Sequence, residues 1–285
     1  MRLALLICLG IAMMCPPTIA EVAISEEVVE IPVTVTSWSG HDFQHSITVT
    51  IFRDKEKALS PFLILNHGRA VREADRRKMG RSRYLENSRY FVSKGFAVFV
   101  PTRVGYGITG GDDVEYSGDC LAKDYRPAYE VAARQSMKVI AYLRDLPYID
   151  ATRGIVVGQS FGGMTAIALA AKNLPGVVAA INFAGGGGGD PVNSPGRPCR
   201  PDRVAELYSI YGATSRIPTL WLYSENDRYF GIENPHLWFK GFVQIGGIGS
   251  FVQLPPYKND GHPSFTGNTE AWRPAVDEFL RTLGF

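Results

Sequence analysis

The stretch that decides the fold is Gly154-Ile-Val-Val-Gly-Gln-Ser-Phe-Gly-Gly163. An apolar run over residues 155–157 ends in the pattern G-x-S-x-G, and a helix-compatible run over residues 164–171 follows at once. The order predicts a strand, a sharp turn and a helix, with Ser160 at the apex. Such a turn lifts the hydroxyl clear of the sheet and points the helix N-terminus at whatever the serine attacks. We interpret Ser160 as a nucleophile; the alternative is a structural turn in which the serine only caps the helix.

The composition indicates one large globular domain. The chain has 285 residues, of which 45% are hydrophobic and 20% are charged. This length and balance suit a single domain with a full core, which we place at residues 21–285. The net charge of +2 argues against a dedicated nucleic-acid-binding protein.

The first twenty residues have the pattern of a secretory signal peptide. Arg2 is followed by an apolar run over residues 3–14, by a Pro-Pro pair and by the small-residue segment Thr18-Ile19-Ala20. The apolar run is short for a membrane span, so we predict cleavage after Ala20 and export to the periplasm or medium. An uncleaved N-terminal anchor is the alternative. No other segment is predicted to cross a membrane, and no lipid-modified cysteine is predicted.

Removal of the signal peptide leaves two cysteines, Cys120 and Cys199. Both lie in segments rich in Gly, Pro and Asp, and an exported chain with two cysteines favours a disulfide. A bridge would close a long loop, worth about 4–5 kcal/mol in chain entropy, and would shape the rim of a substrate pocket. Two unrelated free thiols are the alternative.

Apolar patterning along the chain predicts an α/β architecture. Residues 28–38 and 46–52 alternate between apolar and polar residues, as an antiparallel pair at a sheet edge does. Later apolar runs are continuous, as in strands buried on both faces of a parallel sheet. Between the runs lie stretches with helical spacing, so we expect a mostly parallel sheet with helices on both faces and a ligand at the carboxyl ends of its strands. The expected buried strands are 62–65, 96–100, 155–157, 177–181 and 220–223, followed by a late strand at 251–254. The expected helices are 82–94, 129–144, 164–172, 204–211, 235–242 and 270–283.

A serine hydroxyl needs a base, and the base needs a group that orients it. His262 lies in a loop after the last predicted strand, where it can reach the serine; His236 is a weaker candidate, and His41 and His45 flank the edge strand. For the orienting acid, Asp227 and Glu225 both follow the strand at 220–223. We favour Asp227 because it lies further past the strand end.

The order Ser160, Asp227, His262 resembles that of the α/β-hydrolases, and the resemblance extends from about residue 28 to the C-terminus. Residues 65–68 (Leu-Asn-His-Gly) match the oxyanion loop of that family. Residues 101–107 are similar to the Arg-Gly-Tyr-Gly segment of dienelactone-hydrolase-like and acyl-peptidase-like members, although Val104 is inserted and the nucleophile is serine rather than cysteine.

The resemblance implies a serine hydrolase that cleaves a carboxylic ester of a small molecule through an acyl-enzyme. It further implies that the backbone N–H groups of Phe161 and Arg69 receive the oxyanion, and that His67 shapes its loop. A peptidase of the acyl-peptidase kind and a non-catalytic binding protein with this fold are the alternatives.

Two other features call for interpretation. The five glycines at 185–189 lack the Lys-Ser/Thr of a phosphate-binding loop, so we expect them to bring backbone close to the substrate. The arginine-rich segment 69–83 is either a solvated surface or a means of holding an anionic substrate or envelope surface. No metal-ligand spacing is present, and no cofactor or metal is predicted.

Overall fold

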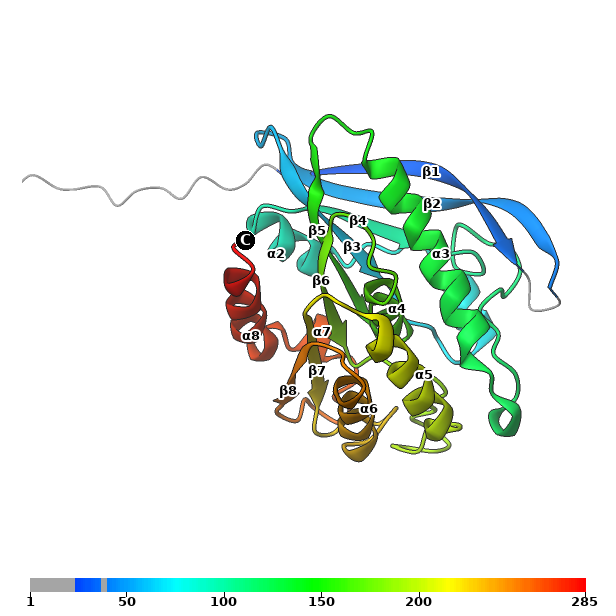
Figure 1. Cartoon of the computed structure of the whole chain (residues 1–285). Coiled ribbons are helices and arrows are strands. Elements are labelled where there is room, and N and C mark those ends of the chain that lie inside the picture. The colour runs from blue at the N-terminus through cyan, green and yellow to red at the C-terminus, as the bar shows by residue number, and fades with distance from the viewer. Residues whose placement is uncertain (1–23, 37–39) are drawn as a thin grey trace, which may run out of the picture.

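The computed structural model describes residues 24–36 and 40–285, and its centre is one sheet with the strand order β1-β2-β4-β3-β5-β6-β7-β8 (Figure 1). The predicted signal peptide and Trp38 lie outside the described residues. The strands are β1 (Ile24–Thr36), β2 (Asp42–Asp54), β3 (Ser60–Asn66), β4 (Ala97–Thr102), β5 (Ile149–Gln159), β6 (Val177–Phe183), β7 (Thr219–Ser224) and β8 (Gly249–Leu254).

The antiparallel edge predicted from alternation is confirmed. Strand β1 pairs with β2 in an antiparallel register that sets Ile31 opposite Ile47, and β2 pairs antiparallel with β4. The other neighbours in the sheet are parallel. Strands β1 and β2 both extend beyond their apolar segments, because backbone pairing continues where the side chains are already exposed.

Helices cover both faces of the sheet. Residues of α3 to α6 pack in one core cluster, and residues of α2, α7 and α8 pack in the other. Figure 1 shows α8 on the opposite side of the sheet from α5 and α6. The helices are α1 (Glu73–Lys78), α2 (Leu85–Ser93), α3 (Tyr125–Leu143), α4 (Phe161–Ala170), α5 (Pro201–Thr214), α6 (Glu233–Gln244), α7 (Ser264–Gly267) and α8 (Thr269–Thr282), with the 3-10 helix η1 (Cys120–Ala122).

The continuous apolar runs are buried on both faces, as predicted. In β5, Val156 packs in one core cluster while Ile155 and Val157 pack in the other. The parallel strands therefore all end at one edge of the sheet, and the loops that follow β3, β5, β6, β7 and β8 meet there.

Short elements depart from the sequence expectation. Helix α1 lies inside the arginine-rich segment and has only charged residues and one alanine, so no apolar period indicated it. Cys120 begins the 3-10 helix η1 rather than lying in irregular loop. Within the described part of the chain, no helix is long and apolar enough to cross a membrane.

Candidate active site

Ser160 lies between the last residue of β5 and the first residue of α4, as the strand–turn–helix pattern predicts. Its backbone has φ 57° and ψ −124°, which is strained for a residue with a Cβ and costs about 1–3 kcal/mol. The flanking glycines make the tight turn possible. A Cβ on Gly158 would stand 2.0 Å from the carbonyl oxygen of Gly162, and a Cβ on Gly162 would stand 2.1 Å from that of Asn66.

Two of the predicted side chains form a buried pair. Nδ1 of His262 lies 2.9 Å from Oδ2 of Asp227, and the two residues are 6% and 3% exposed. The other carboxylate oxygen accepts the backbone amides of Tyr229 and Phe230 at 2.8 and 3.1 Å. In the neutral imidazole, Nδ1 must then carry the proton, because a carboxylate can only accept, and Nε2 holds the lone pair. Nε2 is buried and has no hydrogen-bond partner among the described residues.

The competing residues lie elsewhere. Glu225 is exposed, and its own amide donates to the carbonyl of Leu254. His236 hydrogen-bonds the side chain of Gln253 on the outer strand, at 2.8 Å. His41 directly precedes β2 and His45 lies in it, near the antiparallel edge of the sheet. Of the acids and histidines considered from the sequence, the structure therefore brings Asp227 and His262 together.

Gln159, the residue before the serine, joins the loops around it. Its amide donates to the carbonyl of His262 at 3.2 Å, and its Oε1 accepts the hydroxyl of Tyr84 at 3.2 Å. The amide of Gly68 donates to that same hydroxyl at 3.3 Å. Sequence reasoning missed this role, because the motif leaves the position open to any residue.

The loop after β3 passes directly beside the serine. A Cβ on Gly68 would stand 3.2 Å from Cβ of Ser160. Arg69 follows in that loop, and Phe161 is the first residue of α4, so the amide of Phe161 has no partner within its helix. Both Arg69 and Phe161 line the same cavity as Ser160.

His67 is held inside the protein in a neutral form. Its Nδ1 donates to the carbonyl of Gly68 at 2.7 Å, and its Nε2 accepts the amide of Arg103 at 3.1 Å. Burial, and next the positive charge of Arg103, hold the pKa of His67 well below its usual 6.5. This placement agrees with a structural role for His67 in the loop.

A fully buried ion pair supports that loop from behind. The guanidinium of Arg103 pairs with the carboxylate of Glu115 and donates to the carbonyl of His67 at 2.9 Å; both charged side chains have 0% exposure. The inserted residue Val104 is also accommodated, since its amide donates to Oε1 of Gln135 at 2.8 Å. Glu115 was missed from the sequence because nothing in its local pattern marks a buried acid.

Ser160 opens into a cavity of about 360 Å³, within the size range of small-molecule sites. The glycines at 186–189 line it and are called here the glycine wall, and residues of the segment from Asp113 to Lys123 line it as well. No three His, Cys, Asp or Glu side chains in the described ranges are grouped to hold a metal ion, and the absence of a metal or cofactor stays a prediction. The lining residues are Arg69, Ala70, Val71, Arg76, Asp113, Tyr116–Asp119, Cys120, Lys123, Tyr125, Ser160, Phe161, Gly186–Asp190, Cys199, Tyr229 and Phe230.

Tyrosine hydroxyls hold the glycine wall in place. Tyr129 donates to the carbonyl of Gly186 at 2.8 Å, and Tyr223 donates to that of Gly185 at 2.6 Å. The amide of Gly186 in turn donates to the carbonyl of Ser160 at 3.3 Å. The loop is therefore in contact with the strained turn, and its approach to the substrate stays a prediction.

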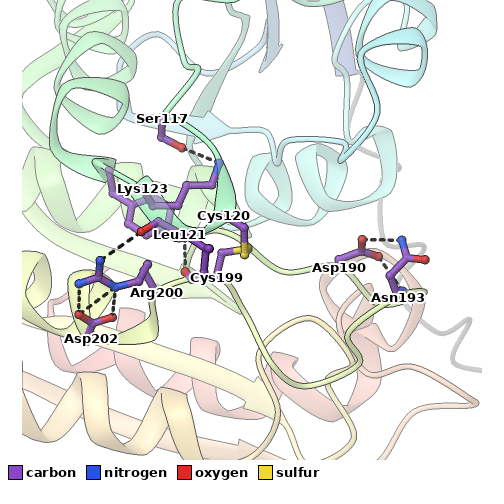
Figure 2. The surroundings of a disulfide bond; sticks show 10 residues. Ser117, Cys120, Leu121, Lys123, Asp190, Asn193, Cys199, Arg200 and Asp202 are labelled. Atoms are coloured by element: carbon purple, nitrogen blue, oxygen red, sulfur yellow. Dashed lines mark hydrogen bonds and ion pairs between the residues drawn. A yellow bond between two sulfur atoms is a disulfide. The ribbon is translucent and has the colours of Figure 1, made fainter.

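The predicted disulfide between Cys120 and Cys199 is present, with the two Cα atoms 5.0 Å apart (Figure 2). Both cysteines line the cavity, and the amide of Cys199 donates to the carbonyl of Gly188 at 2.9 Å. The bridge thus ties the segment with η1 to the glycine wall.

The chain belongs to the alpha/beta hydrolase family, whose model matches residues 67–283. It is therefore a hydrolase of the α/β fold. Ser160, in the turn between β5 and α4 that we call the elbow, lies at the carboxyl edge of the sheet, as do Asp227 and His262. A search of curated proteins finds no match.

Solved structures with the same fold include hydrolases of several kinds. An esterase of Pyrococcus furiosus aligns with a TM-score of 0.61 at 13% identity, over 96% of this chain and 98% of that one. A dienelactone-hydrolase-like promiscuous phosphotriesterase from metagenomic libraries aligns with a TM-score of 0.55 at 13% identity, over 90% and 98%. The acylaminoacyl peptidase of Pyrococcus horikoshii aligns with a TM-score of 0.56 at 14% identity, over 90% of this chain but 41% of that one. At these identities the likeness concerns the fold.

Proposed function

We propose that this protein is an exported serine hydrolase that cleaves a carboxylic ester through an acyl-enzyme on Ser160. The proposal rests on the strained backbone of Ser160 and on the buried His262–Asp227 pair at the same edge of the sheet. Nε2 of His262 has no hydrogen-bond partner among the described residues. The cysteine pair, bridged as in oxidising compartments, supports export.

In the proposed mechanism, Oγ of Ser160 attacks the ester carbonyl while Nε2 of His262 takes its proton. Asp227 keeps the proton of the imidazole on Nδ1 and stabilises the imidazolium that forms. The tetrahedral intermediate collapses to an acyl-enzyme as the imidazolium returns the proton to the departing alcohol. Water then repeats the sequence and releases the acid.

The developing oxyanion is received by backbone N–H groups, which we assign to Phe161 and Arg69. The N-terminus of α4 adds the positive end of a helix dipole at the same place. The loss of one such donor costs about 10²–10³ in kcat. The buried Arg103–Glu115 pair keeps the Arg69 loop in position, because it holds the carbonyl of His67 two residues earlier.

The nucleophile is tested by labelling with a fluorophosphonate probe, which reacts with activated serines. Wild type should label and hydrolyse a short-chain 4-nitrophenyl ester, and Ser160→Ala should do neither. Ser209→Ala is the matched control and should label as wild type does. Ser209 is a partly buried serine of α5 whose hydroxyl donates to the carbonyl of Ala205. Equal labelling of wild type and Ser160→Ala would refute the assignment.

The probe and the ester, together with a peptide substrate, separate the esterase from its alternatives. A peptidase of the acyl-peptidase kind should cleave a blocked peptide 4-nitroanilide at a rate comparable to the ester. A non-catalytic binding protein should neither label nor turn over either substrate.

A further inference from the structure

Three cations, Arg69, Arg76 and Lys123, line the cavity beside Ser160, and the carboxylate of Asp113 binds the two arginines. Arg69 grips Asp113 through two hydrogen bonds of 2.7 and 2.5 Å, and Arg76 donates to the same carboxylate at 2.9 Å. Lys123 lines the same cavity. Two guanidinium groups therefore share one carboxylate, and a third cation lies beside them.

Lys123 has weaker contacts than the arginines. Its Nζ donates to the hydroxyl of Ser117 at 3.3 Å (Figure 2). The same Nζ lies 5.7 Å from the ring centre of Tyr116. Among the ion pairs of the described residues, none includes Lys123, while Arg69 and Arg76 both have one.

Burial, and next the positive charge of Arg69, lower the pKa of Lys123. The carboxylates of Asp119 and Asp113 act on this pKa in the opposite direction, without forming an ion pair with Lys123 in the described structure. An anion at this position would offset the repulsion between Arg69 and Lys123 and would give Lys123 an ion pair.

The other acids at the cavity are engaged elsewhere. The carboxylate of Asp190 accepts the backbone amides of Val192 and Asn193 at 3.1 and 3.0 Å. It also accepts the side-chain amide of Asn193 at 2.7 Å. Figure 2 shows it directed toward Asn193, across the disulfide from Lys123. Asp119 is exposed and accepts the hydroxyl of Tyr116 at 2.7 Å. The three carboxylates that line the cavity thus balance its three cations in number, but none of them forms an ion pair with Lys123 among the described residues.

We propose that this cavity binds esters that carry a carboxylate, and that Lys123 contacts this carboxylate while the ester carbonyl lies at Ser160. The inference rests on the proposed function and names its substrate class. Arg69 lines the same cavity and holds the carboxylate of Asp113 through two hydrogen bonds, so this part of the cavity already binds a carboxylate. A single lysine without an ion pair matches a singly charged group.

The energetic effect follows from burial. A partly buried ammonium is screened by salt less than a surface lysine is, and a charge-assisted hydrogen bond is stronger than a neutral one. Loss of that contact should lower the preference for the charged ester by roughly tenfold to a hundredfold.

The experiment compares matched pairs of esters that differ only in charge. Mono-4-nitrophenyl adipate against its ω-amide places the carboxylate in the acyl part, and 4-acetoxybenzoate against 4-acetoxybenzamide places it in the leaving group. The readout is the ratio of kcat/KM for the charged and neutral members, in wild type, Lys123→Met, Lys123→Arg and Lys240→Met. Lys240 is an exposed lysine of α6 outside the cavity and controls for net charge.

We expect wild type and Lys240→Met to prefer the charged member of at least one pair, Lys123→Met to lose that preference, and Lys123→Arg to recover part of it. The pair that shows the effect identifies which part of the substrate faces Lys123. Equal ratios in wild type and Lys123→Met for both pairs would overturn the proposal.

A binding measurement keeps this test separate from that of the proposed function. Calorimetry with 4-acetamidobenzoate, against the uncharged 4-acetamidobenzamide, requires no catalysis. Carboxylate binding that Lys123→Met weakens supports the charged site even if neither ester is hydrolysed, in which case the proposed function alone is wrong. Binding that is equal for both ligands, or equal in both proteins, refutes the site.

Discussion

Replacement of Asp227 by asparagine should remove nearly all activity and leave the fold intact. The retained Oδ1 of the asparagine can still accept the amides of Tyr229 and Phe230, so the side chain keeps its orientation. The new NH₂ group then takes the place of Oδ2 and faces Nδ1 of His262, which lies 2.9 Å away. An amide NH₂ only donates, so Nδ1 must accept and the imidazole proton moves to Nε2.

With its proton on Nε2, the imidazole cannot act as base toward Ser160. The same substitution in a well-studied serine protease lowers kcat by about 10⁴-fold, and we expect a loss of that order here, about 5.5 kcal/mol in the barrier. Because two of the three hydrogen bonds of Asp227 persist, the melting temperature should change by only a few degrees.

Steady-state hydrolysis of a short-chain 4-nitrophenyl ester and thermal melting measure these two effects. Glu225→Gln is the matched control, since Glu225 is exposed two residues away and its side chain contacts neither His262 nor Asp227 in the described structure. A folded Asp227→Asn that keeps more than a tenth of wild-type kcat would refute the reasoning, as would a comparable loss in Glu225→Gln.

Two further predictions concern stability. The disulfide spans 79 residues, so the double variant Cys120→Ser/Cys199→Ser should lose about 4–5 kcal/mol and melt roughly 10 °C lower, with a raised KM because the glycine wall loosens; unchanged melting and KM after reduction with dithiothreitol would contradict this. His67 stays neutral in the fold, because burial and then Arg103 depress its pKa, while the unfolded chain takes up a proton below pH 6.5. The unfolding free energy should therefore fall with decreasing pH, by about 1.4 kcal/mol per pH unit below 6.5 from this group, and urea unfolding at pH 7.5 and 5.0 should show a smaller difference, by about 2 kcal/mol, in His67→Asn. Identical pH dependence in the two proteins would show that His67 is not the group responsible.

The sheet and its main helices could be predicted because their signal is local. Continuous apolar runs marked β3 to β7, and each is buried as expected, while alternation marked the antiparallel edge. The turn at Ser160 could be predicted for the same reason, since a strand, a G-x-S-x-G turn and a helix are contiguous in the sequence.

The parts that escaped prediction depend on contacts across the fold. Gln159 and Tyr84 meet only after strands and loops 75 residues apart come together, and Glu115 is recognisable as a buried acid only once Arg103 packs against it. The sequence favours Asp227 over Glu225 from its place past the strand end, and the turn after β7 indeed directs Asp227 to His262 and leaves Glu225 exposed.

The glycine wall has a consequence for how the substrate range of this protein can change. A Cβ on Gly187 would stand 2.7 Å from the hydroxyl of Tyr129, one on Gly188 would stand 2.1 Å from that of Tyr125, and one on Gly189 would stand 2.7 Å from Cβ of Tyr229. Mutation therefore cannot add side chains to this wall without displacing the aromatic residues behind it. Selection for new substrates is therefore expected to act on the lining positions that already present side chains, such as Val71, Tyr116 and Lys123.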